Sequence, residues 1–573
     1  MNFVGTLGRV RLASARFAGR CRTPDALAWL LLTGAAILVL ATFTDYGVTW
    51  DEDLHNWYGI EALNYYLSGF ADSRALQFKD LINYGAAFDM LAAALNRFSP
   101  LGVYETRHLL DAAFGILGLA GCWRLGRALG GKRAGLLALL LLLLTPNYYG
   151  QMFNNPKDIP FAVGGVWALY YMVRILPALP RPKLRLVVKL GLAIGLALGV
   201  RVGGLLFLCY LGLLLGLSAA WQAAVARRLS VVLTTGWTSL WRVLLPAAAV
   251  GFAVMLVFWP WGQSDPIGHT LQALAFFSHQ TFPYSTLFDG RFVPASDLPW
   301  DYLPTYIVLA LPELVLALLI AAAALAATGL VRILARGELA PRRAEVLGLF
   351  LLGFSIVFPV AYAILIKAVL FDGMRHFIFV LPPIAVAAAL ALDRGLKALA
   401  GLPYRQAVYA ALGLYGAAHV TTMVLLHPDQ YIYYNAFVGG VDGAQRNFKL
   451  DYWANSYAEA VHGLEAYLLK QYGAEFEERE FTVAVCGPPV SAAYYFPANF
   501  RFVHQRDTAD FFIAFTKDNC DRALPGNPVY RVTRMGALLS VVLDRRAIVA
   551  ERRVAKRPLA HAAPRQPEAA GFP

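Results

Sequence analysis

Two neighbouring stretches near the N-terminus decide the fold: "ALAWLLLTGAAILVLATFT" (residues 26–44) and "TWDEDLHNWYG" (residues 49–59). The first stretch has no charged residue and has about the length, roughly 20 residues, that a helix needs to cross a bilayer. The second stretch places Asp51, Glu52 and Asp53 directly behind that helix. Acidic groups are costly at the mouth of a transmembrane helix, and they are therefore candidate functional residues.

The composition of the whole chain extends this interpretation. Of 573 residues, 58% are hydrophobic and 15% are charged, whereas soluble domains carry about 25% charged residues. Repeated apolar runs therefore predict a polytopic α-helical membrane protein. The net charge of +13 indicates Lys and Arg in cytoplasmic loops rather than a nucleic-acid partner.

The apolar runs predict about eleven transmembrane helices, with an ambiguity at 184–219, which is either one tilted span or two short ones. Two spans keep every basic loop on one side, which the positive-inside rule makes cytoplasmic, and they place Arg201 at the outer turn. The predicted spans are 26–44, 104–125, 134–150, 159–177, 184–199, 202–219, 242–261, 304–328, 345–369, 374–392 and 404–426.

This topology divides the chain into regions. Residues 1–25 form a cytoplasmic basic N-terminus, and 26–426 form the transmembrane domain with external catalytic loops 45–103, 151–158 and 262–303. From 427 the chain becomes polar, with strand-like runs "FTVAVC", "DFFIAFT" and "LLSVVLD" and an amphipathic helix around 456–472. We predict a small extracytoplasmic α/β domain over 427–550 and a disordered tail over 551–573.

Two of the five cysteines, Cys486 and Cys520, fall in the predicted outer domain. If the strands that precede them are neighbours in a parallel sheet, both cysteines lie at one sheet edge and a disulfide fits. The alternative is that Cys486 is a small buried hydrophobe and Cys520 a surface loop residue.

The acidic stretch also has the pattern of a helix start. Thr49-x-x-Glu52 matches a capping box, Asp51 falls in the first turn near the positive end of the helix dipole, and His55 lies one turn further on. Trp57 and Tyr58 suit an interfacial depth. A purely structural interpretation, with Glu52 as a cap and Asp51 as a solvated acid, is the alternative.

Cations recur in the other outward segments. In "NNPKDIPF" (154–161) helix capping accounts for the Asn, Pro and Asp, but it does not account for Lys157. "FDGMRHF" adds Arg375 and His376, and Lys367 lies about one turn before it. A carboxylate can act as a general base, and cations can hold a phosphate leaving group. Because mid-helix charges are scarce, an enzyme is favoured over a pump.

Several stretches resemble the GT-C class of glycosyltransferases, in particular the bacterial relatives of protein O-mannosyltransferases and of the lipid A aminoarabinose transferase (glycosyltransferase family 39). The resemblance covers most of residues 26–545. It is carried by "DYGVTWDE", "FNNPKDIPF", "LPWDYLPTYIVLALPELVLALL" and "FDGMRHFIFVLPPIAV", and "YYNAFVGGVDGAQRNFKLDYWANSYAEA" is similar to the junction with the C-terminal domain of such proteins.

The resemblance implies inverting transfer of a sugar from a polyprenyl-phosphate carrier to an extracytoplasmic glycan, lipid or protein acceptor, in a bacterial inner membrane. It implies that Asp51 is the catalytic base, with Glu52 following it and Asp158 as a second acid. The candidates for the donor phosphate are Lys157, Arg201, Lys367, Arg375 and His376, and those for the acceptor or sugar are His55, Trp57 and Tyr58. His55-Asn56-Trp57 replaces the Ala and Arg usual in aminoarabinose relatives, which leaves open the identity of the acceptor and of the sugar, a hexose or a pentose.

Two alternatives remain open at this point. One is a transporter of lipid-linked glycans, or a polysaccharide export component, that performs no covalent chemistry. The other adds a divalent metal held by Asp51, Glu52 and His55. The sequence has no nucleotide-binding glycine motif, so no further cofactor is predicted.

Overall fold

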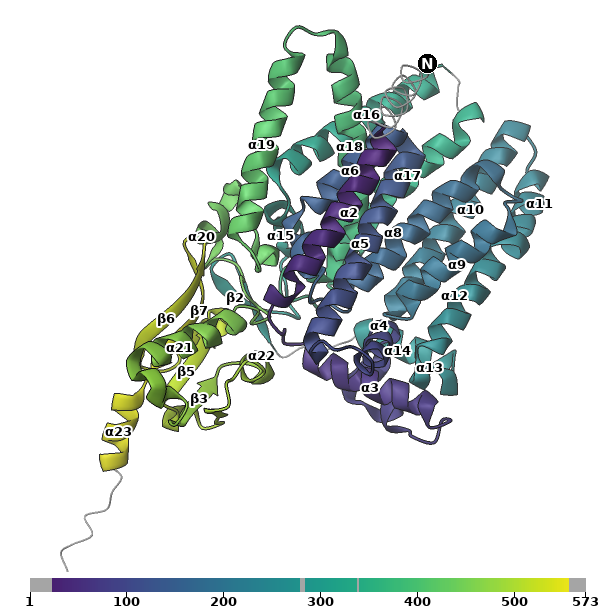
Figure 1. Ribbon diagram of the computed structural model, residues 1–573. Helices are drawn as coiled ribbons and strands as arrows, with labels where there is room; N and C mark the ends of the chain where they lie inside the picture. The colour runs from purple at the N-terminus through teal and green to yellow at the C-terminus, as the bar shows by residue number, and fades with distance from the viewer. Residues whose placement is uncertain (1–22, 279–283, 337–339, 556–573) are drawn as a thin grey trace, which may run out of the picture. The chain divides into compact units, whose positions relative to one another are not determined.

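The computed structural model describes residues 23–278, 284–336 and 340–555, so the predictions for 1–22 and for the tail from 556 lie outside the described residues. The chain folds as two compact units (Figure 1). Unit 1 comprises Met1–Trp453 with Arg534–Ala537, and unit 2 comprises Ala454–Thr533 with Leu538–Pro573. The segment 427–453, which the sequence assigned to the outer domain, thus packs within unit 1.

Unit 1 is a bundle of helices, and in the described part of the chain nine helical stretches are long and apolar enough to cross a membrane. The protein is a multi-pass membrane protein. The helices that form these stretches are α2 (Pro24–Thr42), α5 (Val103–Gly130), α8 (Asp158–Ile175), α10 (Leu205–Ala226), α11 (Ser230–Ser239), α12 (Leu245–Val257), α16 (Glu313–Ala335), α17 (Arg343–Leu365), α18 (Leu381–Ala398) and α19 (Arg405–Leu425). Short turns extend several of them: η1 (Phe43–Asp45), η4 (Leu176–Ala178), η5 (Val202–Gly204), η6 (Leu240–Leu244), η8 (Arg375–Val380) and η9 (Leu399–Gly401).

Two further helices, α6 (Lys132–Leu143) and α9 (Leu184–Leu198), run beside the long ones. At 1.5 Å per residue they are roughly 18 and 22 Å long, which is shorter than the roughly 30 Å hydrocarbon core. The predicted count of eleven spans is therefore not confirmed. The run 184–219 folds as two helices, because α9 ends at Leu198 and η5 begins at Val202, but only the second of them is among the nine stretches long enough to span.

Two predicted spans are wrong as single helices. The run 134–150 is divided into α6 and α7 (Pro146–Gln151), and the run 304–328 is divided into α15 (Tyr302–Ala310) and α16. In each case the break precedes a proline, Pro146 or Pro312. A proline disfavours helical backbone in the residue before it, and Leu311 accordingly has extended dihedrals.

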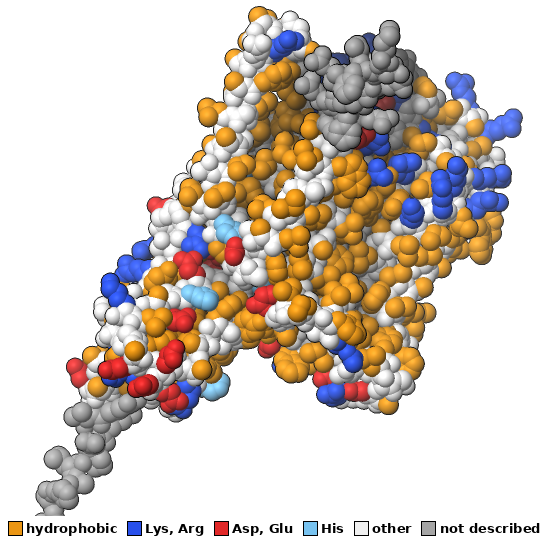
Figure 2. Space-filling view, in the orientation of Figure 1, with side chains coloured by type: hydrophobic (Ala, Val, Ile, Leu, Met, Phe, Trp, Pro, Cys, Tyr) orange, Lys and Arg blue, Asp and Glu red, His pale blue; other side chains and the backbone are white. Residues whose placement is uncertain are grey.

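Short elements gather at the end of unit 1 where α5 and α8 begin, which we call the α3 end (Figure 1). Hydrophobic side chains cover the bundle, and Lys and Arg gather toward its opposite end, the basic end (Figure 2). The remaining elements of unit 1 are α3 (Glu52–Leu67), α4 (Ala87–Asn96), α13 (Pro260–Ser264), α14 (Gly268–Ser278), α20 (Gly440–Ala444) and the antiparallel hairpin of β1 (Ser285–Phe288) and β2 (Arg291–Pro294).

A close approach of two backbones positions the loop before α4. A Cβ atom on Gly85 would lie 2.1 Å from the carbonyl oxygen of Gly199, so only glycine fits there. Gly85 N–H donates to Val200 O at 3.2 Å, and Tyr84 forms a β-bridge with Arg201. The contact therefore fixes Tyr84 beside Arg201.

Unit 2 is an α/β domain built on a five-stranded sheet of order β4-β3-β5-β7-β6. β3 is parallel to β4 and to β5, whereas β5 is antiparallel to β7. The central strand β5 is buried along its whole length, which is typical of a strand covered on both faces. The strands are β3 (Phe481–Val485), β4 (Phe500–Phe502), β5 (Phe511–Phe515), β6 (Asn527–Arg534) and β7 (Ala537–Asp544).

The predicted amphipathic helix is α21 (Tyr457–Tyr472), and its apolar side chains are buried with helical spacing at Tyr457, Val461, Leu464 and Leu468. The other helices of unit 2 are α22 (Val490–Ala493) and α23 (Arg546–Ala555). The three predicted strands are confirmed as β3, β5 and β7, but the edge strands β4 and β6 were not predicted.

The parallel pairing of β3 and β5 brings Cys486 and Cys520 together, and the two form a disulfide with a Cα separation of 6.2 Å. We expect alkylation of the denatured, unreduced protein to leave both cysteines unmodified, and prior reduction to make both reactive. Peptide mass spectrometry measures this, with Cys209, a free cysteine, as the positive control. Labelling of Cys486 without a reductant would contradict the bond.

Candidate active site

The carboxylate of Asp51 lies at the start of α3 between two cations from distant parts of the chain. Its Oδ2 is 3.4 Å from Nζ of Lys157, just before α8, and 3.3 Å from Nη2 of Arg375, at the start of η8. The side chain of Asp51 is 24% exposed, whereas that of Arg375 is 6% exposed. Asp51 is therefore accessible but is not a solvated loop acid.

The two cations also decide the protonation state of Asp51. Burial by itself favours the neutral acid, but the positive charges of Lys157 and Arg375 outweigh it and hold the pKa of Asp51 well below its usual range. In this state Asp51 is a carboxylate that neutralises two cations. Its pKa rises to that of a useful base only when another anion pairs with Lys157 and Arg375 in its place.

A second ion pair lies beside the first. Nη2 of Arg201 is 2.8 Å from Oδ1 of Asp158, and Asn155 donates to the other oxygen of Asp158 at 3.0 Å. The ring of Tyr84 joins the two pairs, because Lys157 lies 5.2 Å and Arg201 5.8 Å from its centroid. Asp158 is thus fully engaged in positioning Arg201.

Arg375 is held from behind by a third carboxylate. Asp372 lies 3.7 Å from Nη1 of Arg375, and Nζ of Lys449 lies 3.5 Å from the other oxygen of Asp372. The guanidinium also lies 4.9 Å from the ring centroid of Phe371 and 5.4 Å from that of Trp453. These contacts fix the direction of Arg375.

Together these residues form the charge cluster, which has three carboxylates, Asp51, Asp158 and Asp372, and four cations, Lys157, Arg201, Arg375 and Lys449. The cations exceed the carboxylates by one, so the cluster favours an added anion. Tyr84, Lys449 and Trp453 were missed in the sequence. The dense polar and aromatic run "KLDYW" (449–453) is a signal that could have indicated the last two.

Glu52, by contrast, points away from the cations. It accepts hydrogen bonds from N–H and Oγ1 of Thr49 at 2.8 and 3.0 Å, and it lies 3.1 Å from Nε2 of His108. The bond to Thr49 N–H is one half of the predicted capping box. Since both oxygens are occupied and Glu52 is 1% exposed, its contacts are those of a structural residue.

A buried group of charged residues links α3 to α4 and α5. Nδ1 of His55 lies 2.7 Å from Asp89, and Arg107 lies 2.7 Å from the other oxygen of Asp89. Burial would raise the pKa of Asp89, but His55 and Arg107 lower it overall. Burial lowers the pKa of His55, with a further contribution from Lys157. Neutral His55 therefore donates from Nδ1 to an ionised Asp89.

The other predicted site residues form no hydrogen bond or ion pair with the charge cluster in the described part of the chain. Tyr58 is fully buried and donates to Tyr84 O at 2.9 Å, while Trp57 is exposed. His376 packs edge-on against Phe371, with ring centroids 4.7 Å apart. Lys367 lines a separate cavity of about 100 Å³.

The residues proposed as metal ligands do not converge. No group of three His, Cys, Asp or Glu side chains in the described residues is arranged to hold a metal ion. His55 is directed at Asp89, Glu52 at Thr49 and His108, and Asp51 at two cations. This donor set does not fit a divalent metal.

Part of this region matches a known protein family. The model of the dolichyl-phosphate-mannose-protein mannosyltransferase family matches residues 105–261. The matched segment contains Lys157, Asp158 and Arg201 of the charge cluster. It confirms the resemblance to glycosyltransferases of this class over that segment. No curated protein sequence matches the chain.

Solved structures of low identity resemble the chain over most of its length. ArnT from Cupriavidus metallidurans, solved bound to undecaprenyl phosphate, has 16% identity and a TM-score of 0.46, and covers 90% of this chain and 98% of its own. The oligosaccharyltransferase of Archaeoglobus fulgidus has 13% identity and a TM-score of 0.42, with coverage of 81% and 63%. The arabinofuranosyltransferase AftD from Mycobacteria has 13% identity and a TM-score of 0.41, with coverage of 90% and 40%.

We expect Asp89→Asn to destabilise the protein, because it leaves Arg107 buried with a weakened partner. Breaking a buried ion pair costs about 3–5 kcal/mol of unfolding free energy. Asp72→Asn is the matched control, since Asp72 pairs with the exposed Arg74 at 2.6 Å, and we expect little change there. The midpoint of thermal unfolding measures both variants, and equal midpoints would contradict a supporting role for Asp89.

Proposed function

We propose that the protein is a glycosyltransferase that moves a sugar from a polyprenyl-phosphate carrier to an acceptor outside the membrane, with inversion at the anomeric carbon. The observation that carries this proposal is the Asp51 carboxylate shared between Lys157 and Arg375. A base and an anion site are thereby joined in one place. The match of residues 105–261 to the mannosyltransferase family supports the same class of chemistry.

The donor enters by exchange of anions. The donor phosphate replaces Asp51 as the partner of Lys157 and Arg375. Arg201, which Asp158 holds in place, supplies a third positive group. Guanidinium groups bind phosphate through paired, charge-assisted hydrogen bonds. Because Asp372 and Lys449 hold Arg375 from behind, its guanidinium is already oriented and loses little freedom when the phosphate binds.

Donor binding activates Asp51. Once its cations turn to the phosphate, the pKa of Asp51 rises from its lowered value toward the range of a useful base. Asp51 then takes the proton of the acceptor hydroxyl or amine as that atom attacks the anomeric carbon. The bond from the anomeric carbon to the phosphate oxygen breaks, and polyprenyl phosphate leaves with the charge stabilised by the cations.

The other acids have supporting roles in this reaction. Asp158 orients Arg201 through their ion pair. Glu52 caps the start of α3 through Thr49, and Asp89 fixes the ring of His55. His55 keeps its neutral ring next to the site and is the remaining candidate for a sugar contact. The charge cluster lies at the α3 end. The positive-inside rule predicts that this end faces the outer side of a bacterial inner membrane, with the N-terminus inside and unit 2 outside.

We expect Asp51→Asn to lower turnover by about 10²- to 10⁴-fold, the usual effect of removing a general base. Binding of polyprenyl phosphate should persist, because the cations stay in place. Transfer from a radiolabelled polyprenyl-phosphate sugar to envelope material measures turnover, and binding to the protein in lipid discs measures affinity.

Asp53→Asn is the matched control for Asp51→Asn. Asp53 is two residues away, and its carboxylate accepts from Tyr104 Oη at 2.8 Å, outside the charge cluster. We expect its turnover to stay close to that of the unaltered protein. Equal, small effects of the two substitutions would reject Asp51 as the base. If Asp51→Asn still moves the lipid-linked sugar across the membrane, a transporter would be favoured instead.

We expect Arg375→Ala to weaken binding of polyprenyl phosphate by about 10- to 100-fold, the usual loss of affinity when one charge-assisted hydrogen bond is removed. Arg375→Lys should restore only part of it, since an ammonium cannot reproduce the planar, paired donors of a guanidinium. Lys367→Gln is the control, because Lys367 lies in another cavity. A loss with Lys367→Gln but not with Arg375→Ala would place the phosphate elsewhere.

A further inference from the structure

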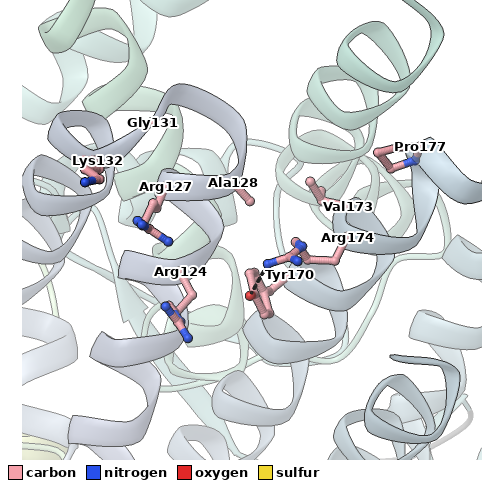
Figure 3. A pocket seen from close by; sticks show the side chains of 9 residues that line it. All are labelled: Arg124, Arg127, Ala128, Gly131, Lys132, Tyr170, Val173, Arg174 and Pro177. Atoms are coloured by element: carbon pink, nitrogen blue, oxygen red, sulfur yellow. Dashed lines mark hydrogen bonds between the residues drawn. The ribbon is translucent and has the colours of Figure 1, made fainter. Parts of the chain in front are cut away.

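A second site lies at the basic end of unit 1, where α5 and α8 end and α6 begins (Figure 3). It is a pocket of about 410 Å³. Arg174, which lines it, is sixteen residues beyond Asp158 on α8, or roughly 24 Å along the helix axis. The pocket is therefore separate from the charge cluster and has no part in the reaction proposed above.

The pocket carries an excess of positive charge. Four cations line it: Arg124, Arg127, Lys132 and Arg174. Asp25 pairs with two of them, at 2.9 Å from Nε of Arg127 and 3.7 Å from Nζ of Lys132. In the described ranges no ion pair includes Arg124 or Arg174. One carboxylate thus faces four cations.

The two arginines without an acidic partner are nevertheless held in place by aromatic rings. Arg174 Nη1 donates to Tyr170 Oη at 3.0 Å, and the guanidinium of Arg124 lies 5.3 Å from the ring centroid of Trp123. Figure 3 shows Arg124 and Arg127 on one helix and Arg174 with Tyr170 on the other. Guanidinium groups from two helices therefore face one space, where a single anion can bridge them.

The general excess of Lys and Arg at a cytoplasmic membrane face explains the presence of these residues, but it does not explain why they line a cavity. The preceding segment of the chain does not supply the missing negative charge, because residues 1–22 contain arginines and no acidic residue. The opposing charge is thus expected from a ligand.

We propose that this pocket binds a phosphate group, and that the phosphate belongs to the headgroup of an anionic phospholipid. Apolar side chains, Ala128, Val173 and Pro177, also line the pocket, as the glycerol end of a lipid requires. Basic pockets between transmembrane helices at the cytoplasmic face are suited to such headgroups. Inorganic phosphate shares this chemistry and is the alternative source.

The test is native mass spectrometry of the full chain, purified from bilayers that contain phosphatidylglycerol and phosphatidylcholine. We expect retained phosphatidylglycerol, and at least about tenfold weaker retention in the double variant Arg124→Gln/Arg174→Gln. Lys183→Gln/Arg185→Gln is the matched control, because it removes the same charge from exposed residues near the same end, outside the pocket. Its phosphatidylglycerol binding should be unchanged.

The outcomes separate the two sources of phosphate. Retention that falls only in the pocket variant supports a lipid headgroup. Binding of inorganic phosphate that depends on Arg124 and Arg174, without retention of phosphatidylglycerol, assigns the pocket to a free anion and overturns the lipid assignment. If both double variants bind both anions like the unaltered protein, the site is rejected. Unchanged elution on size exclusion shows that each variant is folded.

Discussion

The candidate active site depends on one carboxylate that has two cationic partners. Without Asp51, Lys157 and Arg375 would face each other in a partly buried space, where like charges repel strongly. With Asp51, three segments that are more than a hundred residues apart in the chain are tied together at one point. In the proposed reaction the same arrangement sets the chemistry, because Asp51, which neutralises the two cations at rest, is the group that the donor phosphate releases from them.

The surrounding structure is organised to keep that arrangement fixed. Gly85 against Gly199 places Tyr84 between Lys157 and Arg201, and Asp89 with Arg107 holds the helix that begins after Asp51. Each cation of the cluster has either a carboxylate or an aromatic ring beside it. A cation so restrained cannot move to solvent, and an incoming anion meets donors that are already oriented.

Much of this could be predicted from local patterns, and the remainder depends on packing between distant segments. Asp51, Lys157 and Arg375 were identified because acids and cations recurred in segments assigned to one membrane face. Lys367 and Arg375 had equal standing in the sequence, since they lie on either side of the same outward turn, at the ends of two neighbouring predicted spans, and only the fold separates them. Tyr84 gave no local sign of its role, and Lys449 was marked only by the dense polar and aromatic run "KLDYW". The two-helix breaks at Pro146 and Pro312 were readable from proline but were masked by the continuous hydropathy around them.

The distribution of the cluster along the chain has a consequence for synthesis. Its members enter at positions 51, 157, 158, 201, 372, 375 and 449, so the cluster is completed only as further parts of the bundle are made. The transmembrane helices end at Leu425, before Lys449 is translated. A nascent chain thus completes its membrane-inserted bundle before Asp372 has its second cation. Under the proposed function, the contacts that orient Arg375 toward the donor phosphate are therefore completed only after the last transmembrane helix has been made.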